Sequence, residues 1–477
     1  MDKIVKTCIA GVMAFAFSGC SLAPVYQKPE LPVASTLQDR YLAQLPSSGR
    51  TGGTENLSGA GWREIFTDPV LQQLITAALK NNRDLRVTAL NVEAYQAQYR
   101  IRKANQLPTL AVDGYASKQR GLAGSGNTTT EAYSLQVGVT AYELDFFGRV
   151  RNLKDQALEQ YLAMEETRKS AEISLVAEVA RAYLTWLADR ELLQISRDTE
   201  LVENESYALV QQRLNGGVAT ELDLAQARSS LEGVRANLAM YRRQVAQDYH
   251  YLNLLTGTSL SENILPEEGM LHEVKPLAVM PDSLSSSVLL RRPDIIAAEH
   301  QLQGANANIG AARAAFFPTI SLTAGAGIVS SDLMDLFDGS SGSWLLKPSI
   351  SLPIFTAGRL QAELDVAKIQ KEQSVAQYEL AIQTAFREVS DALIAVDTYE
   401  EQLLAQKGNL DASEQYFQHA KKRYEEGVDS FLTLLDAQRS LYSSRQAYLA
   451  LNLAQLENQV NLYKVLGGGW KETTELN

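Results

Sequence analysis

The sequence has few residues of the kinds that carry chemistry. Among its 477 residues there are two cysteines, and Gly467 to Lys471 (GGGWK) lacks the Ser or Thr of a phosphate-binding loop. There is also no Gly-x-Ser-x-Gly nucleophile elbow. The four histidines lack the spacing of a metal site: His250, His272, His300 and His419. We therefore expect a protein that is not an enzyme, with no catalytic residues, no metal site and no cofactor except a covalent lipid.

The sequence also lacks a basic excess and a long apolar run. Its formal net charge is -12, which argues against nucleic acid because binding to phosphates needs a basic face. Downstream of residue 20, no uninterrupted apolar stretch reaches the ~20 residues of a membrane helix. A mature chain that crosses a bilayer would have to cross it with β-strands.

The first residues have the pattern of a lipoprotein signal peptide. Lys3 and Lys6 precede the apolar run Thr7 to Phe17, which ends in Ser18-Gly19-Cys20. This ending is similar to the bacterial lipobox, with Phe17 where Leu is usual. We expect residues 1-19 to be removed and Cys20 to carry the lipid, because a solitary exported cysteine has no disulfide partner. In the lipoproteins that this pattern resembles, a Ser after the Cys implies sorting to the outer membrane. The alternative is an ordinary signal peptide with a spare thiol.

The remaining sequence is written twice at a constant offset of 210, the difference between positions 294 and 84. A register kept over so many landmarks indicates a duplicated structural module. We expect an N-terminal lipid-anchored and equatorial segment at 20-68, a first repeat at 69-257, an equatorial linker at 258-285, a second repeat at 286-467 and a tail at 468-477. The paired landmarks include Asp84 and Asp294, Pro108 and Pro318, Gly148 and Gly358, Arg213 and Arg423, Gly217 and Gly427, and Gly257 and Gly467.

Each repeat is predicted to contain a long helical hairpin. Residues 149-215 contain neither Pro nor Gly, and the matching residues 359-426 contain only Gly408. Nothing in either stretch stops a helix, and at ~1.5 Å per residue each could extend about 100 Å. Glycine-containing turns follow, and the return helices end at Gly257 and Gly467, where Gly can adopt the left-handed conformation. The hairpins therefore span 149-257 and 359-467.

A different pattern precedes each long helix. Residues 109-116 and 134-144, and again 319-328 and 349-355, alternate apolar with small or polar side chains, which predicts β-hairpins at 109-145 and 318-355. Strands of about ten residues with this alternation are typical of outer-membrane barrels. Four strands cannot close a barrel, so several chains must share one. Two chains would give eight strands; the small lumen-side residues favour three chains and twelve strands, with an open lumen. The fold class is thus an α+β membrane protein.

Four segments resemble a known family: Arg292 to Gly327 (RPDIIAAEHQLQGANANIGAARAAFFPTISLTAGAG), Leu435 to Tyr442 (LDAQRSLY), Leu462 to Trp470 (LYKVLGGGW), and the lipobox followed by SLAP. They are similar to the outer-membrane factor lipoproteins of the OprM type, TolC-like outer membrane efflux proteins. The resemblance covers essentially the whole mature chain.

The resemblance implies a homotrimer in the outer membrane, with a twelve-stranded barrel and a twelve-helix periplasmic tunnel. It also implies an exit duct of a tripartite pump, with a periplasmic adapter and an inner-membrane RND transporter as partners. Type I secretion, metal efflux and a periplasmic helical scaffold without a pore are the alternatives. The separated methionines give no hint of copper or silver, which weakly favours small organic substrates.

The hairpin turns carry matched residues, and the family resemblance implies that they dock the adapter. The alternative is simple capping, in which Thr220 or Ser430 caps the return helix and Arg213 or Arg423 neutralises a helix dipole. The candidate docking residues are Arg213, Asn215, Gly217, Val218, Thr220, Arg423, Glu425, Gly427, Val428 and Ser430.

Leu432, Asp436 and Arg439 stand at i, i+4 and i+7, hence on one helical face. The resemblance implies that this face lines the periplasmic entrance, where a ring of carboxylates selects cations and apolar residues gate by dewetting. The alternative is an ordinary helix face that is exposed to water and has no gating role. The first repeat has Leu222, Gln226 and Ser229 at these places, so only the second hairpin carries the charged constriction. Opening would move that hairpin outward, and removing Asp436 or Arg439 should make the channel leaky.

Overall fold

The computed structural model describes residues 21-33, 61-123, 126-260, 264-265, 271, 274 and 286-468. The predicted signal peptide 1-19, the lipid-bearing Cys20, most of the linker 258-285 and residues 469-477 lie outside the described residues. Within the described part, the chain is mostly helical and contains one four-stranded sheet.

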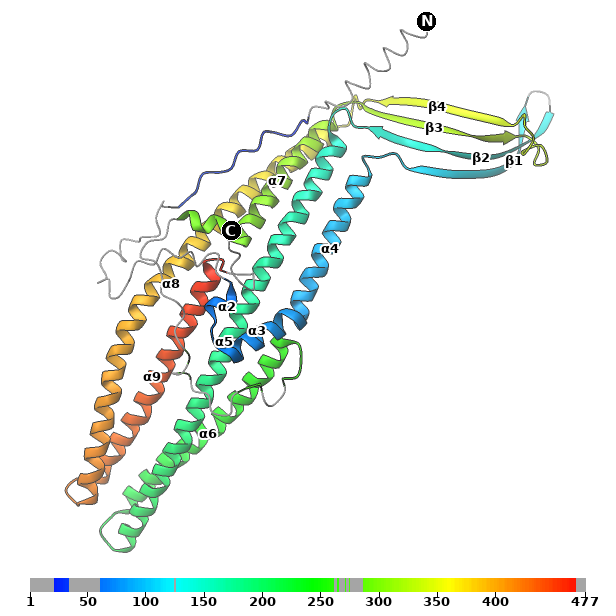
Figure 1. Cartoon of the computed structure of the whole chain (residues 1–477). Coiled ribbons are helices and arrows are strands. Elements are labelled where there is room, and N and C mark those ends of the chain that lie inside the picture. The colour runs from blue at the N-terminus through cyan, green and yellow to red at the C-terminus, as the bar shows by residue number, and fades with distance from the viewer. Residues whose placement is uncertain are drawn as a thin grey trace. The chain divides into compact units, whose positions relative to one another are not determined.

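The elements follow one order twice along the chain (Figure 1). After α2 (Trp62–Ile65) and α3 (Pro69–Asn81) come α4 (Arg83–Ala104), β1 (Leu110–Ala123), β2 (Gly126–Leu144), α5 (Arg149–Asn215) and α6 (Glu221–Thr256). A short 3₁₀ helix, η4 (Ser286–Arg291), then leads into α7 (Pro293–Ala314), β3 (Thr319–Ser330), β4 (Gly342–Ser351), α8 (Arg359–Glu425) and α9 (Phe431–Val465). The two long helices have 67 residues each, as their lack of helix breakers predicts.

Among the described residues, no helix combines the length and apolar character needed to cross a membrane.

The chain divides into two compact units that cut across the predicted repeats. The sheet unit contains residues 1–30, 91–165 and 297–379, and the helical unit contains residues 31–90, 166–296 and 380–477. Each unit therefore takes parts of both repeats, because each long helix begins in one unit and ends in the other. The compact units therefore do not coincide with the two sequence repeats.

The sheet unit holds an antiparallel sheet of order β1-β2-β3-β4 (Figure 1). Leu110 pairs with Val139, Leu135 with Ile328, and Thr319 with Ser351. The register between β2 and β3 shifts between Val139 and Tyr142. All four predicted strands are present, and β1 and β4 form the two edges of the sheet.

Two strand boundaries were predicted wrongly. The connection between the strands predicted at 109-116 and 134-144 is much shorter than expected, since β1 continues to Ala123 and β2 begins at Gly126. The strand expected at 349-355 is β4, Gly342–Ser351, so it begins and ends earlier than predicted. Its first residue, Gly342, has a low intrinsic strand preference but pairs with Ile328, so pairing with β3 holds the start of β4 extended.

Large apolar side chains on the sheet are exposed in the single chain. Their exposed fractions range from 41% for Leu135 to 79% for Trp344, and Leu110, Val112 and Ile350 lie between these values. Contiguous exposed apolar surface of this kind marks contact with a membrane or with another protein.

The segment after Cys20 is fastened to α7 within the sheet unit. Arg313 donates to the carbonyl oxygen of Leu22 at 3.1 Å, and Asn306 donates to that of Pro24 at 2.8 Å. Lys28 forms an ion pair with Glu299 at 2.5 Å. These contacts hold an extended strap along a helix, beginning directly after the predicted lipid site.

The helical unit has a core built from α3, α5, α6 and α9. Ile173, Val176, Ala180, Leu184 and Leu187 are all buried in it, as the mixed spacing of three and four predicts. From α9, Leu449, Leu456 and Val460 complete the same cluster. The start of α3 is fixed by Asp68, whose Oδ1 accepts hydrogen bonds from the backbone N–H groups of Val70 (2.7 Å) and Leu71 (3.0 Å).

Gly257 ends α6 in the left-handed conformation, at φ +65°, and packs closely against α3. A Cβ atom there would lie 2.4 Å from the carbonyl oxygen of Asn81. Gly217 has a similar φ of +74°, but a Cβ there would meet nothing within 4 Å. Substitutions at the two glycines therefore differ mainly in the steric clash, because both positions have similar backbone strain.

We predict that Gly257→Ala destabilises the helical unit by about 3 kcal/mol, because left-handed strain of about 1–2 kcal/mol adds to overpacking of about 1–3 kcal/mol. The matched Gly217→Ala should lower the stability only by the cost of the left-handed backbone strain. Thermal unfolding of both variants at one protein concentration measures the difference. Equal losses of stability would mean that the backbone near Asn81 relaxes freely, contrary to this prediction.

Candidate functional site

Leu432, Asp436 and Arg439 lie on one exposed face at the start of α9. Their neighbours Leu434 and Leu435 point the other way and are buried in a cluster with Val210 and Ala227 of the first hairpin. The face predicted from the spacing is therefore available for contacts outside the single chain. Its chemistry combines an apolar side chain, a carboxylate and a guanidinium.

Two side chains from other helices approach this face. The Tyr416 hydroxyl of α8 donates to Oδ2 of Asp436 at 3.2 Å. Burial raises the pKa of Glu203 on α5, while a hydrogen bond from Ser230 and the charge of Arg439 act in the opposite direction. Arg439 thus has an acidic neighbour within its own chain. Asp436 and Arg439 are linked to α8 and α5, respectively.

The sequence analysis did not identify Tyr416 or Glu203. A partial signal was present for Tyr416, because antiparallel helices joined by a short turn bring residues on either side of Gly427 opposite each other. Glu203 lies on the other hairpin, and no spacing along the chain places it near Arg439. A buried bond from Gln438 to Ser206 (2.7 Å) fixes the relative position of α9 and α5 at this level.

Both hairpin turns have the same backbone hydrogen bonds. The Val218 N–H donates to the Arg213 carbonyl and the Val428 N–H to the Arg423 carbonyl, each at 2.9 Å. With Gly217 and Gly427 at positive φ, these are Schellman caps. The caps leave Val218 and Val428 projecting, with exposed fractions of 77% and 59%. Asn215 and Glu425 are exposed beside them.

The capping roles differ between the two turns. Thr220 forms a full capping box with Asp223 at the start of α6, as the sequence suggests. The expected cap by Ser430 is wrong, since its side chain makes no capping bond. The backbone places the Ser430 hydroxyl instead near the Thr433 hydroxyl, at 3.4 Å.

Arg213 lies in the last turn of its own helix, α5, but its side chain reaches the end of the other long helix. It donates instead to the carbonyl oxygens of Tyr424 (3.1 Å) and Glu425 (3.4 Å) at the end of α8, and its guanidinium lies 4.1 Å from the centre of the Tyr424 ring. Arg423 forms an ion pair with Asp429 at 2.7 Å. Arg213 is therefore a link between the two hairpin tips, a role that the sequence did not reveal.

Asp189 on α5 and Asp248 on α6 form a carboxyl pair further along the first hairpin. Burial, together with the neighbouring charge of Asp248, raises the pKa of Asp189 to about 7. Burial also raises the pKa of Asp248. At neutral pH the folded protein thus retains protons that the unfolded chain has lost.

We predict that this pair destabilises the protein as the pH rises. Because the folded pKa lies above the unfolded value of 3.8, the stabilising effect is complete below about pH 4 and is lost as the pH passes 7. Asp189→Asn should reduce the change in the free energy of unfolding between pH 4 and 7. It should also increase that free energy by about 1 kcal/mol at pH 8, after allowance for solvent screening. Thermal unfolding at several pH values measures this change in stability. An unchanged slope would show that the pair is not coupled to folding.

Among the described residues, no group of three or more His, Cys, Asp or Glu side chains is arranged to hold a metal ion.

Comparison with known proteins places these features in a family. The family model described as outer membrane efflux protein matches residues 74–258 and 284–468. The two matches begin at positions that differ by 210, as the internal landmarks do. Together they cover well over half of the chain.

Individual relatives cover almost the whole length. The toluene efflux pump outer membrane protein TtgC of Pseudomonas putida is 50% identical over 471 residues, covering 97% of this chain and 95% of that protein. The cation efflux system protein CusC of Escherichia coli O157:H7 is 42% identical, with coverages of 98% and 99%. The crystal structure of the open state of the Neisseria gonorrhoeae MtrE outer membrane channel has a TM-score of 0.86 and 38% identity, covering 96% of this chain and 100% of that one.

Proposed function

Because the chain belongs to the outer membrane efflux protein family and acts in the outer membrane as the exit duct of an efflux pump, we propose that it works as a homotrimer. Each chain contributes four strands to a twelve-stranded barrel and two helical hairpins to a twelve-helix periplasmic tunnel. The observation that carries this assembly is the open sheet. Its edges are β1 and β4, and it exposes large apolar side chains.

The physical argument for three chains rests on the edges of the sheet. In lipid, an unpaired strand edge leaves backbone N–H and C=O groups without partners, at a cost of several kcal/mol each. Pairing β4 of one chain with β1 of the next removes both edges. Three chains leave a water-filled lumen, whereas an eight-stranded barrel is filled by side chains.

Cys20 carries the lipid in this proposal, and residues 1-19 are the signal peptide. The strap that begins at Ser21 supports this assignment, since it is bonded to α7 next to the strands. In the same proposal, 69-257 and 286-467 are the two repeats, 20-68 is the N-terminal lipid-anchored and equatorial segment, and 258-285 is the equatorial linker. The tail is 468-477.

The two hairpin tips dock a periplasmic adapter, which joins the duct to an inner-membrane RND transporter. The matched turns favour this role because each presents an exposed valine on a rigid Schellman cap. An adapter with complementary apolar tips would bury both side chains. Capping by Thr220 is compatible with docking, since its bonds lie within the turn.

Leu432, Asp436 and Arg439 form the periplasmic gate. They are exposed in the single chain, and threefold symmetry would bring the three copies of this face together around the axis. The substrates are small organic compounds, a choice supported by TtgC, the more similar of the two relatives, whose name specifies toluene. The name of CusC makes cation efflux the second candidate.

Single-channel recording of the purified protein in a planar bilayer tests the duct. Discrete conductance steps from a particle with the mass of three chains would support the proposal. A monomer that gives no steps in any lipid would instead favour the helical scaffold without a pore. Efflux assays with toluene and with copper ions, in cells that lack the native duct, distinguish the substrates.

A further inference from the structure

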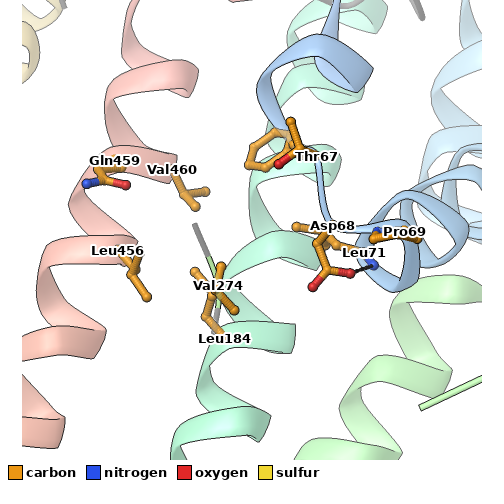
Figure 2. Close-up of a pocket in the computed structure, with 10 residues that line it drawn as sticks. Thr67, Asp68, Pro69, Leu71, Leu184, Val274, Leu456, Gln459 and Val460 are labelled. Carbon is orange, nitrogen blue, oxygen red and sulfur yellow. Dashed lines mark hydrogen bonds between the residues drawn. The ribbon is translucent and has the colours of Figure 1, made fainter. Parts of the chain in front are cut away.

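A cavity of about 320 Å³ lies in the helical unit between the start of α3 and the helices α5 and α9. Figure 2 shows Leu456 and Val460 on one side, Leu184 and Val274 below, and Thr67 and Asp68 on the opposite side. Its volume is within the range of about 300–1,000 Å³ that is usual for small-molecule sites. The proposed duct and its gate make no use of this space.

The inner wall of the cavity is apolar and firmly packed. Leu71, Leu184, Leu456 and Val460 line it, and each side chain is nearly completely buried from water by the surrounding core. Phe66 also lines it and is held by an edge-on contact with Tyr463, with ring centres 5.1 Å apart. A wall of this kind favours an apolar or aromatic group of a ligand.

The polar residues of the cavity include one charged group. Among the lining residues that the structure describes, Asp68 is the only ionisable side chain, and none is Lys or Arg. Its Oδ1 caps α3, while its Oδ2 lies 3.4 Å from the Tyr183 hydroxyl and is turned toward the cavity in Figure 2. The capping bonds fix the carboxylate in place, so a ligand would meet an acceptor that is already oriented.

We propose that this cavity binds a small amphipathic amine, with its apolar part against Leu184 and Val460 and its ammonium group against Asp68. Charge decides between ligand classes here. Among the described lining residues, an anion would face the carboxylate without a cation to offset it, whereas an ammonium gains a charge-assisted hydrogen bond. A neutral molecule of the same shape gains only the apolar contact. The site is separate from the pore and does not rest on the proposed function.

Three probes of matched shape test the charge requirement: phenethylamine, 2-phenylethanol and 3-phenylpropanoate. Binding to the full-length assembly in lipid nanodiscs is followed by ligand-observed NMR, with empty nanodiscs as the blank. We expect phenethylamine to bind with a Kd on the order of 1 mM, as is typical of a fragment of this size. The alcohol should bind more weakly and the anion least.

Two variants locate the site. Asp68→Asn keeps an equally good helix cap, so the variant should fold normally. It should weaken the binding of phenethylamine about tenfold and leave the binding of the alcohol unchanged. Val460→Phe should fill the cavity and abolish binding of both probes. Equal binding of all three probes, no binding beyond the empty nanodiscs, or binding that is insensitive to both variants would overturn the proposal. Because Asp68→Asn retains the cap, a folding failure of Val460→Phe still leaves a decisive comparison.

Discussion

We expect Asp436→Ala to raise the single-channel conductance of the reconstituted protein several-fold. In the resting chain, the Asp436 carboxylate accepts a hydrogen bond from Tyr416, which links α9 to α8 on the exposed face of the second hairpin. In the proposed trimer three such carboxylates would lie around the entrance and offer acceptors to the neighbouring chains. Alanine removes these acceptors, so the second hairpin is free to move outward and the open state gains population. Arg439→Ala should act in the same direction, because the charge of Arg439 opposes the burial that raises the pKa of Glu203 on α5 and so favours the ionised form of that side chain.

Variants at neighbouring positions separate a gate from a general loosening of the tunnel. Tyr416→Phe removes the donor but leaves the carboxylate ring, so it should produce a smaller rise than Asp436→Ala. Gln226→Ala is the matched control, because Gln226 is the residue of the first repeat that corresponds to Asp436. It should leave the conductance unchanged. A rise of the same size in Gln226→Ala, or no rise in Asp436→Ala, would remove Asp436 from the gate.

Selectivity gives a second readout of the same variant. A ring of carboxylates attracts cations into a narrow entrance. The wild-type channel should therefore prefer potassium over chloride, and Asp436→Ala should reduce this preference as well as open the pore. A variant that conducts more while keeping its full cation preference would place the selectivity elsewhere in the tunnel.

The long helices could be predicted from the sequence because the evidence for them is local. Residues 149-215 contain no Pro or Gly, and the helix α5 has these same bounds. Gly408 does not interrupt α8, because a single exposed glycine costs a helix only about 1 kcal/mol. The bounds of β4 were less predictable, since its start at Gly342 is set by pairing with Ile328 of β3, far along the loop that joins the two strands.

The candidate site shows the same limit. The spacing of Leu432, Asp436 and Arg439 places them on one face whatever surrounds the helix, and the structure has them on one exposed face. The partners of that face depend on how helices far apart in sequence are aligned. Arg213 illustrates this, because it crosses to the carbonyl oxygens of Tyr424 and Glu425, about two hundred positions away. No periodicity within either hairpin contains that information.

Arg292 is a buried cation whose loss should strongly destabilise the helical unit. Its side chain is only 9% exposed and joins three elements. It donates to both carboxylate oxygens of Asp294 at the start of α7, to Glu388 of α8 at 2.9 Å, and to the carbonyl oxygen of Val465 at the end of α9 at 2.8 Å. The guanidinium thus satisfies two acids and a helix-terminal carbonyl at one point.

Arg292→Met keeps most of the buried volume but removes every one of these donors. Breaking a buried charge pair costs about 3–5 kcal/mol, because the remaining charges lose their partner. We expect a value near 3 kcal/mol, since Asp294 and Glu388 retain some contact with water, at 42% and 34% exposed. The unfolding temperature at a fixed protein concentration measures the loss.

Arg387→Met is the matched control for this prediction. Arg387 forms an ion pair with Asp391 on the same helix as Glu388, but both side chains are well exposed, at 69% and 64%. Exposed pairs four residues apart contribute only about 0.3–0.5 kcal/mol. A large difference between the two variants would therefore assign the stability to burial and to the shared contacts of Arg292, since charge and residue type change equally in both. Similar losses would mean that water reaches the Arg292 cluster in the assembled protein.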